Sequence, residues 1–322
     1  MHTANPAMNA VREHLRPLGS PVVVFCKSHS GSRLLAQLIE QAGVYMGARQ
    51  NESSDSLDLL ELVKNLVELY YPDYSPLWNA AGRRDDVAST AELARKAIAD
   101  HLKGRDSSSR SLWGWKLCET LYVLPVIDFL FPEARYIHLI RDGRDVAFCN
   151  HTSPNTPFWK KIYFNTDRME RWRGYRLRNK DYYRHSHIFN AMHWYNSVTV
   201  GRTYGAMLRD RYLEVRYEDL CGDFHAQARR ILAHVGATNV EAAIEQLEKK
   251  VYSRSMGKHK LESRSKLREV LRIEKSLLLE LAYLDADPAV STSRSLWNRI
   301  GGLLSVGNQE RRNACPRQLQ TP

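Results

Sequence analysis

The sequence predicts an α/β protein in which a central parallel β-sheet is flanked by helices. Apolar runs of strand length alternate along the chain with segments whose apolar residues recur at helical spacing. Two of these runs, residues 22–25 and 136–140, pass through a short polar turn into a helical segment. A helix between two strands returns the chain to the edge where it began, so the strands pair in parallel and helices cover both faces.

The individual elements follow from the same periodicities. In order, we expect a strand at 22–25, helices at 32–43, 57–70 and 91–102, a strand at 112–116, a helix at 121–131, a strand at 136–140, a helix from 144, a strand at 211–215, and helices at 223–235, 240–250 and 270–284. Gly43 and Pro72 mark the ends of the first two helices. The polar segment 104–110 is expected to be a flexible connection.

The length and composition predict one main domain. A chain of 322 residues with 43% hydrophobic residues can bury a sizeable core. We expect a leader at residues 1–20, with a helical turn near residues 11–15, and a domain at residues 21–285. The tail, residues 286–322, is rich in Ser, Arg, Gln and Asn and shows no extended apolar face.

Charge and cysteine content narrow the class of protein. The net charge of +11 indicates anionic partners: nucleic acid, a membrane surface, or small phosphorylated or sulfated molecules. The five cysteines are widely spaced without a C-x-x-C pair, which argues against a disulfide framework or a zinc ribbon and indicates a reducing compartment. No stretch approaches the roughly 20 apolar residues of a membrane span, and the N-terminus lacks a secretory signal. We therefore expect a cytoplasmic protein.

The first candidate site is the loop CKSHSGS, residues 26–32, between the opening strand and its helix. Small residues at a helix N-terminus expose backbone N–H groups, and the helix dipole favours an anion there. The small residues are Ser28, Ser30, Gly31 and Ser32, and Lys27 and Arg33 add cationic donors. The loop lacks the Gly-Lys-Ser/Thr ending of a nucleotide P-loop, and by itself an ordinary polar connection explains it equally well.

A second candidate site lies in RDGRD, residues 141–145, directly after a predicted strand. Ligands of open α/β sheets bind at the carboxyl ends of the strands. Arg141 lies at such an end, where its guanidinium can bind a phosphate through two hydrogen bonds. Arg144 and Asp145 are interpreted as a surface ion pair.

A third candidate is the segment VYSRSMGKHK, residues 251–260. It places Arg254, Lys258 and Lys260 around Gly257. Alone, it is more typical of a solvated basic loop than of a binding site.

Three longer segments together resemble the successive motifs of PAPS-dependent sulfotransferases. PAPS is 3′-phosphoadenosine 5′-phosphosulfate, the activated sulfonate donor. The segments are CKSHSGSRLLAQLIEQAGV, WGWKLCETLYVLPVIDFLFPEARYIHLIRDGRDVAF and YLEVRYEDLCGDFHAQARRILAHVG. Their order and spacing are more specific than any one motif, and the resemblance covers residues 22–257. It is strongest to the bacterial branch that shares features with tyrosylprotein sulfotransferases, and it implies a P-loop NTPase-like topology.

The resemblance implies how the donor is held. Lys27 would contact the bridging or 5′-phosphate oxygens, while the backbone of residues 30–32 and the Ser32 hydroxyl would hold the 5′-phosphate. Arg33 replaces the hydroxyl residue that is usual in the family.

The resemblance also implies a second phosphate site. Arg141 would bind the 3′-phosphate of PAPS. Cys149 stands where the family usually has a serine on that phosphate, and because a thiol is a weak donor, Asn150 is an alternative. Arg254, Gly257 and Lys258 would belong to a late basic loop that closes over the nucleotide.

Sulfonyl transfer requires in-line geometry, stabilisation of charge on the leaving phosphate, and an activated acceptor. Lys27 and Lys116 are the cations we expect to stabilise that charge, since Lys116 matches the family's second lysine. We expect no metal requirement: the twelve histidines are scattered, and His185 and His187 cannot share one face of a helix.

The general base is predicted to be Glu52 or a histidine. Glu52 lies where tyrosylprotein-type members carry their catalytic glutamate, although NESSDSLDLL also resembles a helix start with a capping carboxylate. His29 and His151 are rivals because both adjoin predicted phosphate-binding segments. We rank Glu52 first and His29 second.

Residues 155–190 are predicted to form an acceptor-cleft insertion. They hold nine Lys/Arg, three Asp/Glu and nine aromatic residues, a mixture that also suits single-stranded nucleic acid. The segment falls where sulfotransferases place acceptor insertions, and aromatic rings with arginines suit sugars that bear acidic groups. The expected acceptor contacts are Arg168, Arg171, Trp172 and Tyr175.

We therefore predict an enzyme that moves a sulfonyl group from PAPS to a hydroxyl of a carbohydrate or glycolipid. The product would be adenosine 3′,5′-bisphosphate, and a lipid acceptor would bring peripheral membrane contact. A tyrosyl or phenolic acceptor is the alternative within the class. Outside it, a P-loop small-molecule kinase is disfavoured by the missing loop ending, and a basic nucleic-acid-binding protein would not need separate phosphate sites.

Overall fold

The computed structural model describes residues 4–78, 84–106, 112–149, 157–164, 186–251 and 256–285. By internal packing the chain divides into two units, Met1–Leu278 and Leu279–Pro322. The first unit holds the sheet and the helices around it. The second, described only for residues 279–285, holds the end of helix α14 (Arg264–Glu280) and a turn.

Four parallel strands form the sheet, in the order β2-β1-β3-β4. The strands are β1 (Val22–Cys26), β2 (Gly114–Lys116), β3 (Arg135–Ile140) and β4 (Tyr212–Arg216). Val24 of β1 is in register with Lys116 of β2 and with Ile137 of β3. The predicted parallel α/β sheet is confirmed, and each of the four expected strands is present with ends shifted by two residues or fewer.

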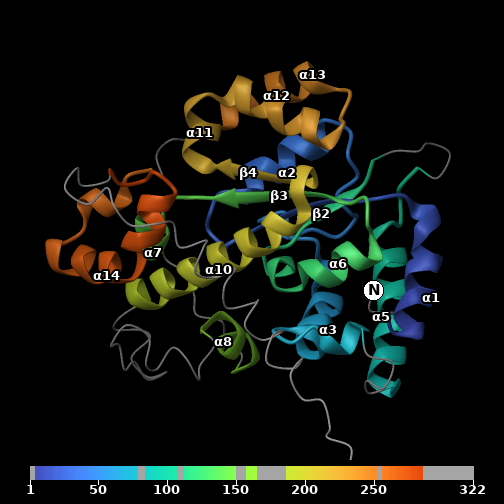
Figure 1. Ribbon diagram of the computed structural model, residues 1–322. Coiled ribbons are helices and arrows are strands. Elements are labelled where there is room, and N and C mark those ends of the chain that lie inside the picture. Colours follow the sequence, from blue (N-terminus) through green and yellow to red (C-terminus); the bar gives the residue numbers. More distant parts are fainter. Residues whose placement is uncertain are drawn as a thin grey trace, which may run out of the picture. The chain divides into compact units, whose positions relative to one another are not determined.

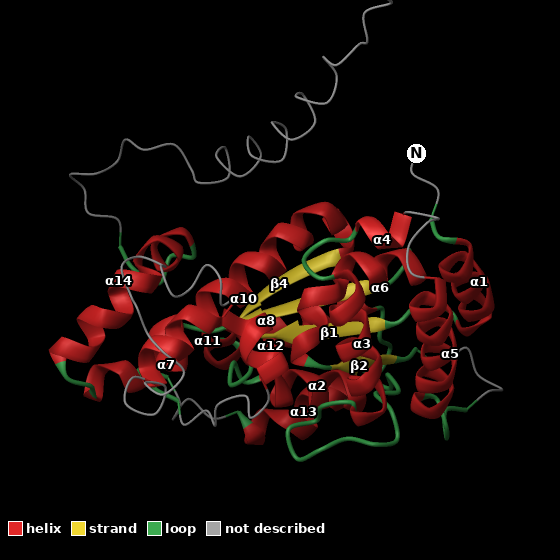
Figure 2. Ribbon diagram, turned by 90° about the horizontal axis from the view of Figure 1, so that it is seen from below, coloured by secondary structure: helices red, strands yellow, loops and turns green. Residues whose placement is uncertain are grey.

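Helices cover both faces of the sheet (Figures 1 and 2). Because successive side chains of a strand point to opposite faces, Val23 and Phe25 of β1 belong to one core cluster, and Val22 and Val24 to the other. The first face is covered by α1 (Pro6–Leu15), α3 (Leu60–Tyr70), α5 (Arg84–His101), α6 (Leu124–Leu130) and α10 (Ser186–Leu208). The second is covered by α2 (Ser32–Gln41), α11 (Tyr217–Gly222), α12 (Phe224–Val235) and α13 (Val240–Leu247).

Shorter elements connect these layers. They are α4 (Ser75–Trp78), α7 (Gly143–Ala147), α8 (Pro157–Phe164) and the 3₁₀ helices η1 (Arg16–Leu18), η2 (Leu57–Leu59), η3 (Cys118–Val123), η6 (Arg209–Arg211), η7 (Glu248–Lys250) and η9 (Lys258–Leu261). The helix expected at 121–131 is therefore η3 followed by α6. The segment predicted as a leader includes α1, whose Met8, Val11 and Leu15 are buried in the core.

Helix α10, of 23 residues, is the main element that the sequence did not predict. Its first half buries eight consecutive residues, from His187 to Trp194, so the apolar positions form no single stripe. Further along, a Cβ on Gly201 would lie 2.6 Å from the His138 ring, and one on Gly205 would lie 2.5 Å from Tyr212. These glycines let α10 pass close to β3 and β4. Within the described ranges, no helix is long and apolar enough to cross a membrane.

Candidate active site

The loop between β1 and α2 forms a tight cradle at the N-terminus of the helix. Gly31 has φ of 91° and begins the helix, and a Cβ there would come within 2.3 Å of the Tyr217 ring. The Ser30 backbone N–H donates to the carbonyl of Lys27 at 3.2 Å. The Ser30 hydroxyl is buried and has no hydrogen-bond partner among the described residues. A buried hydroxyl of this kind normally has a partner, so the cradle fits an anionic ligand such as a phosphate.

Lys27 stands directly after the last residue of β1 and is only 1% exposed. Its Nζ donates to the Ser28 hydroxyl at 3.3 Å. Burial lowers the pKa of Lys27, because the charged form loses hydration. An anion bound at the loop would stabilise the charged form of Lys27 and so raise its pKa again.

Lys116 ends the neighbouring strand β2 and is 2% exposed. Its Nζ donates to the Asp55 carboxylate at 2.6 Å and to the Ser53 carbonyl at 3.0 Å. Burial acts to lower the pKa of Lys116, but the neighbouring Cys118 and Cys26 and the Asp55 carboxylate raise it overall. Lys116 is therefore a permanent cation, and it fixes the segment 53–55 against the end of the sheet.

Arg141 follows the last residue of β3 and is 6% exposed. Its guanidinium lies 4.9 Å from the centre of the Tyr217 ring and donates to the His29 carbonyl at 3.3 Å. Arg141 is thus held beside the opening loop. The Trp194 indole N–H donates to the Arg141 carbonyl at 2.9 Å, which fixes the backbone at the strand end.

The interpretation of Arg144 and Asp145 as a surface ion pair is wrong. Arg144 pairs instead with Asp142, at 2.6 Å, and Asp145 is only 2% exposed. The short helix α7 turns Asp145 inward, where its carboxylate accepts hydrogen bonds from the Gly257 N–H at 2.7 Å and from His259 Nδ1 at 2.7 Å. Asp145 also lies 3.6 Å from Arg141, so it ties the late basic loop to the Arg141 site.

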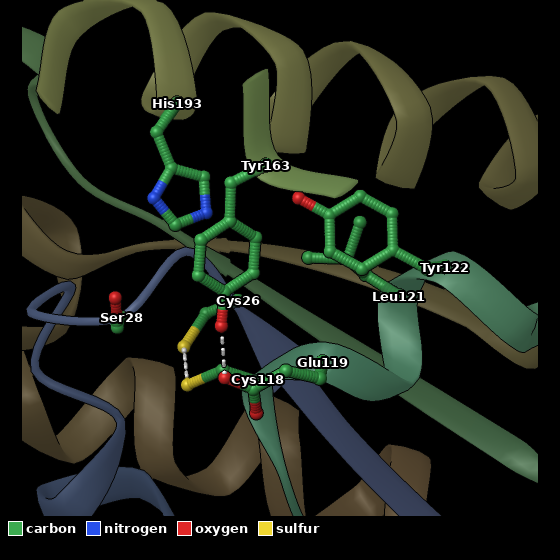
Figure 3. Close-up of a pocket in the computed structure, with 8 residues that line it drawn as sticks. All are labelled: Cys26, Ser28, Cys118, Glu119, Leu121, Tyr122, Tyr163 and His193. Atoms are coloured by element: carbon green, nitrogen blue, oxygen red, sulfur yellow. Dashed lines mark hydrogen bonds between the residues drawn. The ribbon is translucent and has the colours of Figure 1, made fainter. Parts of the chain in front are cut away.

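A small pocket opens beside the loop between β1 and α2, with about 160 Å³ of empty space that includes its open mouth (Figure 3). Its lining residues are Cys26, Ser28, Cys118, Glu119, Leu121, Tyr122, Tyr163 and His193. The Tyr163 hydroxyl donates to Glu119 Oε1 at 2.6 Å, and the Tyr163 ring stacks on His193 with centroids 4.0 Å apart. The thiols of Cys26 and Cys118 lie 3.4 Å apart at its floor. Apart from Ser28, none of these residues was predicted as a site residue. The one feature of the sequence that could have indicated the pocket is the carboxylate of Glu119, three positions after the predicted catalytic Lys116.

A model of the sulfotransferase family matches residues 21–241 of the chain. The protein is a member of the sulfotransferase family. The matched span contains the opening loop, Lys116 and the RDGRD turn, so the resemblance seen in the sequence is confirmed. A comparison with curated protein sequences found no significant match.

The solved structures that match this chain include several sulfotransferases. The sulfotransferase domain of the Synechococcus PCC 7002 olefin synthase is 17% identical, with 84% of this chain and 96% of that chain covered and a TM-score of 0.44. Sulfotransferase STF9 from Mycobacterium avium is 12% identical, with 87% and 83% covered and a TM-score of 0.44. Mouse sulfotransferase SULT7A1, in complex with PAP, is 13% identical, with 95% and 90% covered and a TM-score of 0.39. Identities this low leave residue roles to the geometry of this chain.

The other predicted site residues of this sulfotransferase are placed as follows. Glu52 is exposed, and its carbonyl accepts a hydrogen bond from Arg33 at 3.4 Å, which places the guanidinium beside the segment that Lys116 holds. His29 reaches solvent and has a positive φ of 68°. Partial burial, followed by the charges of Lys27 and Arg141, lowers its pKa to about 4, so the imidazole is neutral at pH 7.

The edge of the sulfotransferase site near Arg141 includes two more predicted residues. Cys149 is half-buried; burial raises the pKa of its thiol, which lies among the charges of Lys27, Arg141 and Lys258. Lys258 is exposed and begins η9 directly after Gly257. The predicted residues Asn150, His151, Arg254, Arg168, Arg171, Trp172 and Tyr175 lie outside the described residues. In the part of the chain that is described, no group of three metal-ligating side chains occurs.

Proposed function

We propose that this sulfotransferase moves the sulfonyl group of PAPS to a hydroxyl group of a carbohydrate or glycolipid. The proposal rests on one observation. Lys116, Lys27 and Arg141, each at most 6% exposed, stand at the carboxyl ends of the adjacent strands β2, β1 and β3. Asp55 pairs with Lys116 and Asp145 lies beside Arg141, whereas no carboxylate among the described residues pairs with Lys27. This edge therefore keeps an excess of buried positive charge that favours an anionic ligand, because unpaired buried charges are costly.

The spacing of these groups fits a ligand with two separate phosphates. The cradle with Gly31, the unpartnered Ser30 hydroxyl and Lys27 suits the 5′-phosphosulfate. Arg141, held over Tyr217, suits the 3′-phosphate, and the loop that Asp145 holds brings Lys258 to the same side. A nucleoside triphosphate bears its charges in one chain and would leave the Arg141 site without a phosphate.

Lys27 and Lys116 are proposed to stabilise the charge that develops on the leaving phosphate. Both are held before any ligand binds: Lys27 by burial at the strand end, and Lys116 by Asp55 and Ser53. Preorganised cations in a site from which water is excluded stabilise such charge more than mobile surface cations do.

The pocket in Figure 3 is proposed to receive the acceptor. The empty space of about 160 Å³ includes the open mouth of the pocket, so only the reacting end of a larger molecule would enter it. Aromatic walls with a carboxylate suit the face and the hydroxyls of a sugar ring. The same aromatic walls suit a phenol, which stays the alternative acceptor.

Ligand-dependent stability tests the donor. We expect adenosine 3′,5′-bisphosphate at one hundred times its Kd to stabilise the fold by about 2.7 kcal/mol, and ATP at the same concentration to stabilise it far less. Thermal unfolding with each nucleotide measures the difference. Equal protection by both would favour a kinase, while salt-dependent binding to random DNA without a nucleotide effect would favour a nucleic-acid-binding protein.

Transfer of label from radioactive PAPS tests the acceptor. We expect incorporation of label into extracted glycans or glycolipids, detected after chromatography. A parallel reaction offers tyrosyl peptides and simple phenols as acceptors. Exclusive labelling of the peptides or phenols would overturn the carbohydrate assignment but leave the sulfotransferase chemistry intact.

A further inference from the structure

We propose that Glu119 is the general base that accepts the proton of the attacking hydroxyl, an inference that rests on the proposed sulfonyl transfer. Glu119 lies in the first turn of η3, three residues after Lys116. Its side chain lines the same pocket as Ser28 of the loop between β1 and α2 (Figure 3). A hydroxyl in that pocket would therefore lie between the carboxylate and the donor.

The carboxylate of Glu119 is held in place. Tyr163 of α8 donates its hydroxyl proton to Oε1 at 2.6 Å, and the Tyr163 ring is fixed by stacking on His193 of α10. An ionised carboxylate has about four lone-pair sites, so the bond from Tyr163 leaves acceptor capacity for a substrate hydroxyl. Tyr163 is thus a positioning residue for Glu119.

The surroundings make Glu119 a stronger base than an exposed glutamate. Burial raises the pKa of its carboxyl, and the hydrogen bond from Tyr163 partly opposes that rise. The titratable and charged groups that face it are Lys27, Asp55, Lys116, Cys118, Tyr122 and Tyr163, and His193 lines the same pocket. A base whose pKa lies nearer to neutrality transfers protons more efficiently.

The two bases ranked first from the sequence fit the pocket less well. Glu52 is exposed and does not line the pocket, and neither does His29. The pKa of His29, lowered to about 4, makes its imidazole a weak base. Glu119 combines access to the pocket with a raised pKa.

In the proposed step, Glu119 takes the hydroxyl proton as the acceptor oxygen forms its bond to sulfur. The bond between sulfur and the bridging phosphate oxygen breaks, and its electron pair leaves with adenosine 3′,5′-bisphosphate beside Lys27 and Lys116. Glu119 then releases the proton to solvent and returns to the carboxylate.

The test compares Glu119→Gln with the wild type on two acceptors that differ in acidity. Water is the first, with release of adenosine 3′,5′-bisphosphate from PAPS alone as the readout. The second is 4-nitrophenol at pH 8, which is already largely ionised and needs no base. We expect the variant to lose roughly 10²–10⁴-fold in kcat with water. With 4-nitrophenol we expect a loss below about tenfold, and the Kd for adenosine 3′,5′-bisphosphate should stay within threefold.

A positioning test uses the pH dependence of kcat for PAPS cleavage. The base acts when deprotonated, so the rate rises as pH increases through the pKa of Glu119. Tyr163→Phe keeps the stacked ring but removes a hydrogen bond that lowers that pKa, so the rise should move to higher pH. Glu119→Gln should abolish the rise, Glu119→Asp should restore part of it, and Glu68→Gln, an exposed change on α3, should leave it in place.

The outcomes separate this inference from the proposed function. A Glu119→Gln rate within threefold of the wild type on water, or equal losses on both acceptors, overturns the role of Glu119. Loss of activity in Glu52→Gln or His193→Asn without loss in Glu119→Gln assigns the base elsewhere. A wild-type enzyme that neither binds adenosine 3′,5′-bisphosphate nor cleaves PAPS overturns the proposed function itself.

Discussion

The Asp145 carboxylate accepts a hydrogen bond from Nδ1 of His259 at 2.7 Å, although the two residues are 114 positions apart in the chain. The same carboxylate accepts the backbone N–H groups of Gly257 and His259, and hydrogen bonds from these groups lower its pKa despite its burial. One side chain therefore joins the turn after β3 to the segment that begins η9. This link brings the two predicted parts of the 3′-phosphate site together.

Replacement of Asp145 by Asn should weaken nucleotide binding. The amide would present N–H groups to the N–H donors whose hydrogen bonds the carboxylate now accepts, so the segment with Gly257 would lose its anchor. We expect this loss to outweigh the gain from removing a negative charge 3.6 Å from Arg141. Hydrogen bonds to a charged group contribute about 1.5–3 kcal/mol, so we expect the Kd for adenosine 3′,5′-bisphosphate to rise roughly 10- to 100-fold. Calorimetric titration measures the change. Asp210→Asn, an exposed control, should bind normally, and an unchanged Kd for Asp145→Asn would show that the loop does not depend on this contact.

Replacement of Lys116 by Met should separate catalysis from binding. Removal of one preorganised charge typically lowers kcat about 10²–10³-fold, while the Lys27 cradle and the Arg141 site still bind the nucleotide. The single variant also leaves the Asp55 carboxylate without its cation, so its melting temperature should fall. In Lys116→Met/Asp55→Asn the stability should recover but the activity should not. If the single variant lost nucleotide affinity instead, Lys116 would be a binding residue.

Gly31 should tolerate no side chain. Its φ of 91° is strained for any other residue by about 1–3 kcal/mol, and a Cβ would overlap the Tyr217 ring at 2.3 Å. We expect Gly31→Ala to lower the melting temperature and to abolish nucleotide-dependent stabilisation. Gly222→Ala is a suitable control, because a Cβ there meets nothing within 4 Å. Normal nucleotide protection in Gly31→Ala would mean that the loop rearranges without cost.

Glu274 should make stability depend on pH. Both oxygens of this fully buried carboxyl are without hydrogen-bond partners among the described residues, and burial, with the nearby Asp142, raises its pKa well above the ordinary value. A raised folded-state pKa gives stability that is complete below the unfolded pKa and is lost as pH rises toward the folded one. In that window the wild type should lose about 1.4 kcal/mol per pH unit relative to Glu274→Gln.

Denaturant unfolding of the wild type and Glu274→Gln between pH 5.5 and 8.5 measures this difference. The advantage of the variant should grow with pH until the folded carboxyl ionises. Glu68→Gln should show no such trend, since Glu68 is exposed. A constant difference between wild type and Glu274→Gln across the range would place the folded pKa near its ordinary value.

Much of the fold was predictable because its signals are local. The strand–turn–helix units around β1 and β3 show apolar runs, small turn residues and helical spacing within about twenty residues of sequence. Helix α10 was not predictable in this way, because it is buried on nearly all sides in its first half and shows no apolar stripe. Its burial comes from packing against β3, β4, α7 and α8, contacts that no local pattern records.

By itself, the sequence determined the parallel sheet, the family and the cations Lys27, Lys116 and Arg141, because each is tied to a strand end or a motif of fixed spacing. Only the tertiary structure decided the partners of those residues. Asp145, expected to form a surface ion pair, is buried and accepts a hydrogen bond from Gly257. Glu119, Tyr163 and His193, from η3, α8 and α10, line one pocket. The reason is physical: hydrogen bonds and burial depend on distance in space, and residues far apart in the chain share no periodicity that would reveal them.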